Sequence, residues 1–72
     1  MASLNETIAK NIRKRLAELN EKQGYLSEKL GTTRESVSMT LKNLADGKSI
    51  TTKKLEEIAK ALGLQTEELL KE

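Results

Sequence analysis

The segment 23–44, QGYLSEKLGTTRESVSMTLKNL, contains two helical patterns that a single glycine separates. Leu26 and Leu30 lie on one side of the first pattern, which we expect to form a helix from Gln23 or Tyr25 to Leu30. Gly31 gives the backbone the freedom for a sharp turn. Thr33 is a typical N-cap residue, and it predicts a second helix over about 33–45 that ends at Asp46-Gly47. The segment therefore predicts two short helices joined by a tight turn.

The chain before this segment predicts one longer helix. Ser3 to Glu6 has the spacing of a capping box, with a hydroxyl at the N-cap and a carboxylate three residues later. Apolar residues then recur at helical spacing, at Leu4, Ile8, Ile12, Leu16 and Leu19. We expect this helix to run from about Leu4 to about Glu21, with Gly24 as its C-terminal stop.

The chain after the segment predicts two more helices. Thr51 or Thr52 caps the first of them, and Gly63 stops it. Its buried positions are Leu55, Ile58, Ala59 and Leu62. A last short helix starts at Thr66, with Leu69 and Leu70 expected to pack inward. The chain is thus predicted to be all-α, a compact bundle of about five short helices forming one domain over 3–71.

Composition excludes several classes of function. The 72 residues contain no Cys and no His, and the single aromatic is Tyr25. A disulfide framework and a thiolate metal site are therefore impossible, and the commonest general base is missing. A core of this size leaves no room for a deep substrate cavity, so we expect no enzyme activity, cofactor or small-molecule ligand. With no membrane span or signal peptide expected either, we predict a cytoplasmic, nucleoid-associated protein.

The charge is distributed unevenly along the chain. Residues 1–31 carry six Lys/Arg and four Asp/Glu, residues 32–54 carry five and two, and residues 55–72 carry two and five. Positive charge is thus densest around the second helix of the central segment, which suits docking on phosphates. The alternative is that these side chains are ordinary solvated helix faces.

The predicted helix over 33–45 has two unlike sides. On a helical wheel, Val37 lies with Leu41 and Leu44, whereas the opposite side carries Glu35, Met39 and Lys42 with short polar neighbours. Ser and Asn are weak helix formers, so their presence here points to a partner rather than to folding. Such a helix suits the DNA major groove, so the segment predicts a helix-turn-helix. The candidate base-reading residues are Arg34, Glu35, Ser36, Ser38, Met39 and Lys42.

Each reading residue has its own chemistry and its own alternative. Arg34 can donate two hydrogen bonds to guanine, Glu35 can accept one from the cytosine amino group, and Met39 can pack on a thymine methyl. Alternatively, Arg34 and Glu35 are only a favourable pair at a helix start. Met39 is alternatively a dimer contact or a plain exposed residue.

A second group of polar residues is predicted to bind phosphates. Backbone N–H groups and hydroxyls at helix starts suit this role. The candidates are Gln23, Tyr25, Thr32, Thr33, Asn43, Lys48, Ser49, Thr51 and Lys53. Lys48 and Lys53 are alternatively ordinary solvated lysines.

The central segment resembles the helix-turn-helix of the cyclic-AMP receptor and FNR family of bacterial regulators. The matching positions are Gln23, Leu26, Leu30, Gly31, Thr33, Arg34, Glu35, Val37, Ser38, Leu41 and Leu44. The resemblance implies that Arg34 and Glu35 read G and C. Met39 stands where that family commonly has a third reading residue, an Arg, so the family's target sequence does not carry over.

The flanking segments resemble phage-repressor and Cro-type domains. In those domains the helix-turn-helix forms helices 2 and 3 of a compact five-helix bundle, which we expect here. The regular caps and the many Lys/Glu pairs also resemble an engineered or redesigned sequence. A thermophile or phage origin is the alternative.

The expected function is sequence-specific binding of double-stranded DNA by a transcription-regulator-like domain or a designed binder, acting as a monomer or homodimer. The rival is a protein-interaction module, such as an antitoxin-like or regulatory bundle. Leu64, Leu69 and Leu70 would form its interface, whereas the first reading places them in the core.

Overall fold

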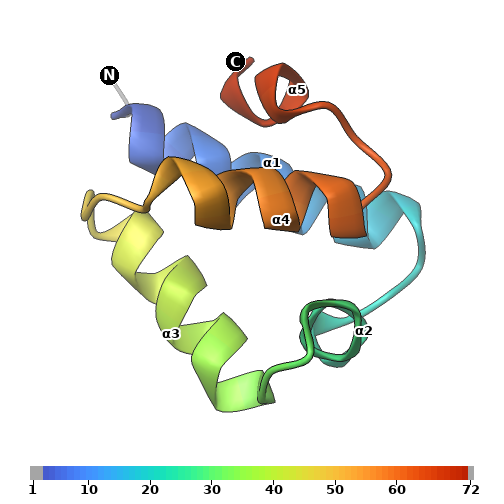
Figure 1. The fold of residues 1–72 in the computed structure, drawn as a ribbon. Helices are drawn as coiled ribbons and strands as arrows, with labels where there is room; N and C mark the ends of the chain where they lie inside the picture. The colour runs from blue at the N-terminus through green and yellow to red at the C-terminus, as the bar shows by residue number, and fades with distance from the viewer. Residues whose placement is uncertain (1–2, 72) are drawn as a thin grey trace.

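The computed structural model describes residues 3–71, and these residues fold into five α-helices without a strand (Figure 1). The helices are α1 (Leu4–Glu18), α2 (Gln23–Leu30), α3 (Arg34–Ala45), α4 (Thr52–Ala61) and α5 (Thr66–Leu70). The predicted all-α bundle of five short helices is confirmed. In Figure 1, α5 lies above α1 and α4, whereas α2 and α3 lie below them.

Three helices begin where a hydroxyl caps them. The side chains of Ser3, Thr33 and Thr51 each accept the backbone N–H of the third residue that follows, at 3.2, 3.1 and 3.2 Å. Each such cap stabilises a helix by about 1 kcal/mol. The predicted starts of α1, α3 and α4 are therefore confirmed, with Thr51 rather than Thr52 as the cap of α4.

The predicted end of α1 is wrong. The helix ends at Glu18, and Asn20 rather than Gly24 adopts the left-handed conformation, with φ of 57°. The N–H of Glu21 then bonds to the carbonyl of Leu16 at 2.8 Å, which closes the last turn. Asparagine tolerates this conformation because its short polar side chain bonds locally. Gly24 belongs instead to the first turn of α2.

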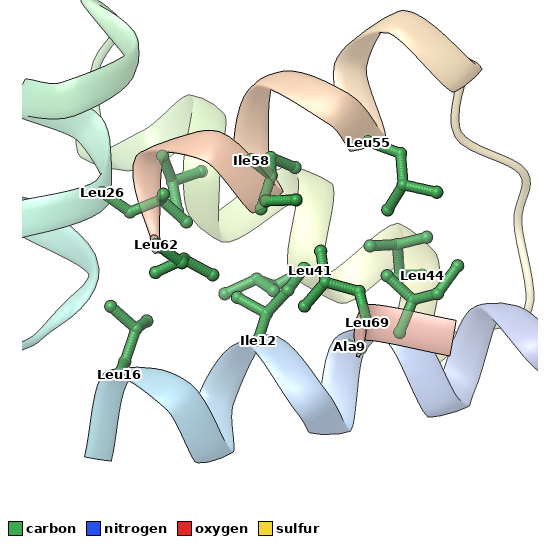
Figure 2. Close-up of a cluster of buried hydrophobic side chains, with 13 residues drawn as sticks. Ala9, Ile12, Leu16, Leu26, Leu41, Leu44, Leu55, Ile58, Leu62 and Leu69 are labelled. Atoms are coloured by element: carbon green, nitrogen blue, oxygen red, sulfur yellow. The ribbon is translucent and has the colours of Figure 1, made fainter. Parts of the chain in front are cut away.

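The core is aliphatic and draws on all five helices (Figure 2). Ile12, Leu41 and Ile58 are each at most 1% exposed. The other buried apolar residues are Ile8, Ala9, Leu16, Leu26, Val37, Leu44, Leu55, Ala59, Leu62 and Leu69. Burying one such side chain stabilises the fold by about 1.5–3 kcal/mol.

The predicted packing of the last helix is half right. Leu69 is fully buried, but Leu70 is 36% exposed. Adjacent residues on a helix point about 100° apart, and in α5 only Leu69 points into the core. Leu64 is partly buried against the core. Leu69 is therefore not accessible for the interface expected under the protein-interaction alternative.

Polar side chains of α1 donate hydrogen bonds to backbone carbonyls at the C-terminal ends of three other helices. Asn5 donates to the carbonyl of Gly47 after α3 at 3.2 Å, and Arg15 Nε donates to Leu62 at the end of α4 at 3.0 Å. The amide of Asn11 donates to carbonyls at the end of α5, on Leu69 and Lys71. Carbonyls at helix ends lack intrahelical partners, so these bonds satisfy them.

Replacing Arg15 by alanine tests how much the interaction of α1 with the end of α4 contributes to stability. The guanidinium is half-buried, and its positive charge lies at the negative end of the α4 dipole. We expect Arg15→Ala to lower the free energy of unfolding by about 1–2 kcal/mol, through the lost hydrogen bond and dipole interaction. Thermal melting followed by circular dichroism measures this. The matched control, Arg13→Ala, removes an exposed cation of the same helix and should change stability by less than about 0.5 kcal/mol.

None of the helices in residues 3–71 is long and apolar enough to cross a membrane.

Candidate nucleic-acid interface

The turn between α2 and α3 is built around Gly31. This residue has φ of 68° and ends α2 in the left-handed conformation. The N–H of Thr32 bonds back to the carbonyl of Ser27 at 2.9 Å, and the N–H of Gly31 bonds to Glu28 at 3.2 Å. This is the hydrogen-bond pattern of a Schellman turn, which stops a helix and redirects the chain at once. The predicted turn is confirmed, and it fixes where α3 begins.

Helix α3 packs one side into the bundle and leaves the other exposed. Val37, Leu41 and Leu44 are buried, and α3 contacts α1 and α2. The exposed side consists of Arg34, Glu35, Ser38, Met39 and Lys42, which we call the reading face. The predicted orientation of α3 is therefore confirmed for its buried side. Five of the six candidate base-reading residues gather on one surface.

Met39 is the large apolar residue most exposed on α3, at 60%. It lies on the same surface as charged and hydroxyl side chains rather than beside another apolar residue of α3. A single exposed apolar side chain is common on protein surfaces. Its position within the reading face is what makes it a candidate contact.

Ser36, the sixth candidate, lies apart from the reading face. It is partly buried and lines a small apolar cavity between α2, α3 and α4, together with Leu26 and Thr32. Its carbonyl accepts the hydroxyl of Thr40 at 2.9 Å. Thr32, a candidate phosphate ligand, is also partly buried here. Both residues therefore face the junction of the helices more than the exposed side of α3.

The candidate phosphate ligands form two groups, one near each end of α3. The first is at the start of α2, where Gln23 is partly exposed and the N-cap is Lys22. Within residues 3–71 no side chain caps the N–H groups of this helix start, and its first turn contains no acidic residue. Uncapped N–H groups and the positive end of the helix dipole favour an anion.

The second group surrounds the start of α4. Lys48, Ser49, Thr51 and Lys53 are exposed, and Asn43 from α3 is partly buried. A shallow hollow brings Asn43 and Ser49 together with Thr51. The Thr51 hydroxyl already accepts an N–H as a cap but keeps its proton to donate to a phosphate oxygen. Thr33, the exposed cap of α3, has the same capacity.

Tyr25 has a different environment from the other candidates. It is partly buried against the core, and Lys29 Nζ lies 5.5 Å from the centre of its ring. That distance is typical of a cation–π contact. The tyrosine lines one hollow with Arg34 and another with the end of α4. It thus joins the start of α2 to the rest of the bundle.

Two residues near the candidate site are not among the site residues predicted from the sequence. Lys54 is partly buried and lines the hollow around Asn43 and Thr51. Its position three residues after the Thr51 cap places it in the first turn of α4, a signal that could have found it. Gly24 is the other, because the side chain of Arg34 lies against it. No pattern in the sequence indicates that contact.

Helices α2 and α3, joined by the turn at Gly31 and with one side of α3 exposed, form a helix-turn-helix within the bundle. Residues 11–71 match the model of a family described as the Cro/C1-type HTH DNA-binding domain. The match covers most of the chain, which therefore belongs to this family. The searches of curated proteins and of solved structures each found no match. The predicted phage-repressor and Cro-type architecture is confirmed, and the likeness of α2 and α3 to the cyclic-AMP receptor motif stays a prediction.

Proposed function

We propose that this DNA-binding domain recognises a specific sequence of double-stranded DNA, with α3 in the major groove. The observation that carries the proposal is the two-sided character of α3. Its apolar side is fixed in the core at Val37, Leu41 and Leu44, so its polar side must face outward. The major groove accepts an α-helix and presents each base pair as a distinct pattern of donors and acceptors.

The reading face supplies candidate partners for guanine, cytosine and thymine. Arg34 would donate to guanine O6 and N7, and Glu35 would accept from the cytosine amino group. Ser38 and Lys42 supply shorter and longer donors, and Met39 would pack on a thymine methyl. Ser36 is a weaker candidate because it is partly buried beside α2 and α4.

Phosphates on the two sides of the groove would bind the two groups that flank α3. Gln23, Tyr25, Thr32 and Thr33 belong to the side of α2. The other side has Asn43, Lys48, Ser49, Thr51 and Lys53, with Lys54 added from the structure. Such contacts set the position of a protein on DNA without reading its sequence.

Lys48→Ala should weaken binding to every duplex alike. Lys48 is exposed in the loop after α3, away from the reading face. A lysine that neutralises one phosphate contributes to affinity through counterion release, so its loss should lower the slope of log K against log salt by about 0.9. Fluorescence anisotropy over a range of salt concentrations measures this slope. A sequence-dependent loss would show that Lys48 reads bases instead.

Selection from a randomised duplex library at about 150 mM salt tests the proposed function, because weak charge interactions are screened there. We expect a short enriched motif that includes a G·C pair. A palindromic motif would indicate a homodimer on two half-sites about one helical turn apart. If no duplex were retained, sequence-specific DNA binding would be wrong, and a protein partner would become the better explanation of the reading face.

A further inference from the structure

Gly24 is a glycine inside a helix. It is the second residue of α2. The turn after α1 does not require it, because Asn20 adopts the left-handed conformation there. Glycine weakens a helix relative to alanine because it loses more backbone freedom on folding. The other three glycines all have a positive φ, which explains them, whereas Gly24 does not. The backbone conformation of Gly24 therefore does not require a glycine at this position.

The side chain of Arg34 lies over Gly24 and supplies a reason for the glycine. A methyl carbon placed on Gly24 would be 3.1 Å from Nε of Arg34, and 3.6 Å from Cζ and Nη2. The first distance is tighter than ordinary van der Waals contact, so an alanine here would require the Arg34 side chain to shift by a few tenths of an ångström, and a larger side chain would displace it further. The first residue of α3 thus rests on the first turn of α2.

Charge does not explain this contact. The start of a helix carries the positive end of its dipole, and the guanidinium is positive as well. Lys22, the N-cap of α2, adds a further positive charge nearby. The contact is therefore one of shape, in which a bare Cα leaves room for a flat group.

We propose that Gly24 is a positioning residue for Arg34. By leaving this space open, Gly24 lets the guanidinium lie along α2 and sets the direction in which Arg34 enters the groove. A long side chain that is held in place loses less freedom when it forms two hydrogen bonds to a base. This inference rests on the proposed reading of DNA by Arg34, and it makes base discrimination depend on a residue that touches no base.

The test compares Gly24→Ala and Gly24→Leu with the unmodified protein. Both replacements are good helix formers, so the melting temperature should stay level or rise by up to about 4 °C. Affinity is measured by anisotropy on the selected duplex and on a duplex altered at the pair that Arg34 discriminates. We expect the preference between the two duplexes to fall about threefold for alanine and about tenfold for leucine, as the larger side chain displaces Arg34 further.

The same replacements in an Arg34→Ala background are the matched control. If Gly24 acts through Arg34, they should leave the remaining preference unchanged there. The inference is wrong if Gly24→Leu keeps the full preference, or if it lowers the preference equally with and without Arg34. If the proposed function itself were wrong, the unmodified protein would prefer neither duplex, and this result differs from either failure of the inference.

Discussion

Val37→Asp should unfold the protein. Val37 is 3% exposed at the centre of the buried side of α3. The change removes an apolar contact of about 1.5–3 kcal/mol and places a carboxylate where it has no partner. The two effects together cost about 5 kcal/mol or more, which would cancel the whole stability of a domain this small, itself on the order of 5 kcal/mol. Far-ultraviolet circular dichroism at 25 °C should show loss of helix.

Ser38→Asp is the matched control for this experiment. It introduces the same side chain at the next residue of α3, where the position is exposed. Surface changes of this kind usually alter stability by less than about 0.5 kcal/mol. If Val37→Asp melted at the temperature of Ser38→Asp, the orientation of α3 in the bundle would be wrong.

Arg34→Ala should relax the preference at one base pair without abolishing it. The bidentate contact of an arginine with guanine discriminates against other bases by about 1–3 kcal/mol. We therefore expect the preferred duplex to lose about 5- to 150-fold in affinity, while a duplex altered at that pair loses much less. Anisotropy titrations on duplexes changed one pair at a time would locate the position.

Lys60→Ala provides the comparison for Arg34→Ala. Lys60 is an exposed cation in the last turn of α4, outside the reading face. Its removal makes the same change in net charge but should leave the preference at every position intact. An equal loss on all duplexes for Arg34→Ala would make Arg34 a phosphate ligand rather than a base reader.

Local signals in the sequence predict most of the fold. A hydroxyl three residues before a free N–H defines the starts of α1, α3 and α4, and a glycine that can take positive φ defines the turn after α2. The apolar spacing in α3 is enough to predict which side is buried. These signals act within one turn of helix, so they can be read without the rest of the molecule.

The errors arise where two local rules compete or where contacts are distant in sequence. Asn20 and Gly24 can both adopt the left-handed conformation that ends a helix. The usual preference for glycine predicts Gly24, whereas Asn20 adopts this conformation. The contact of Arg34 with Gly24 depends on how α2 and α3 meet in space, so no spacing rule indicates it. The angle of Ser36 on α3 predicts an exposed side chain, because that angle alone takes no account of the neighbouring helices that partly cover it.

The hydrogen bond from Asn5 to Gly47 has a consequence for association with DNA. It ties the C-terminal end of α3 to α1, while the Thr33 cap and the turn at Gly31 secure the other end. Binding a partner normally requires ordering loops and side chains, which costs free energy. Helix α3 is held at both ends before any duplex arrives. Little backbone entropy is then left to lose on binding, and the remaining cost falls on the side chains of the reading face.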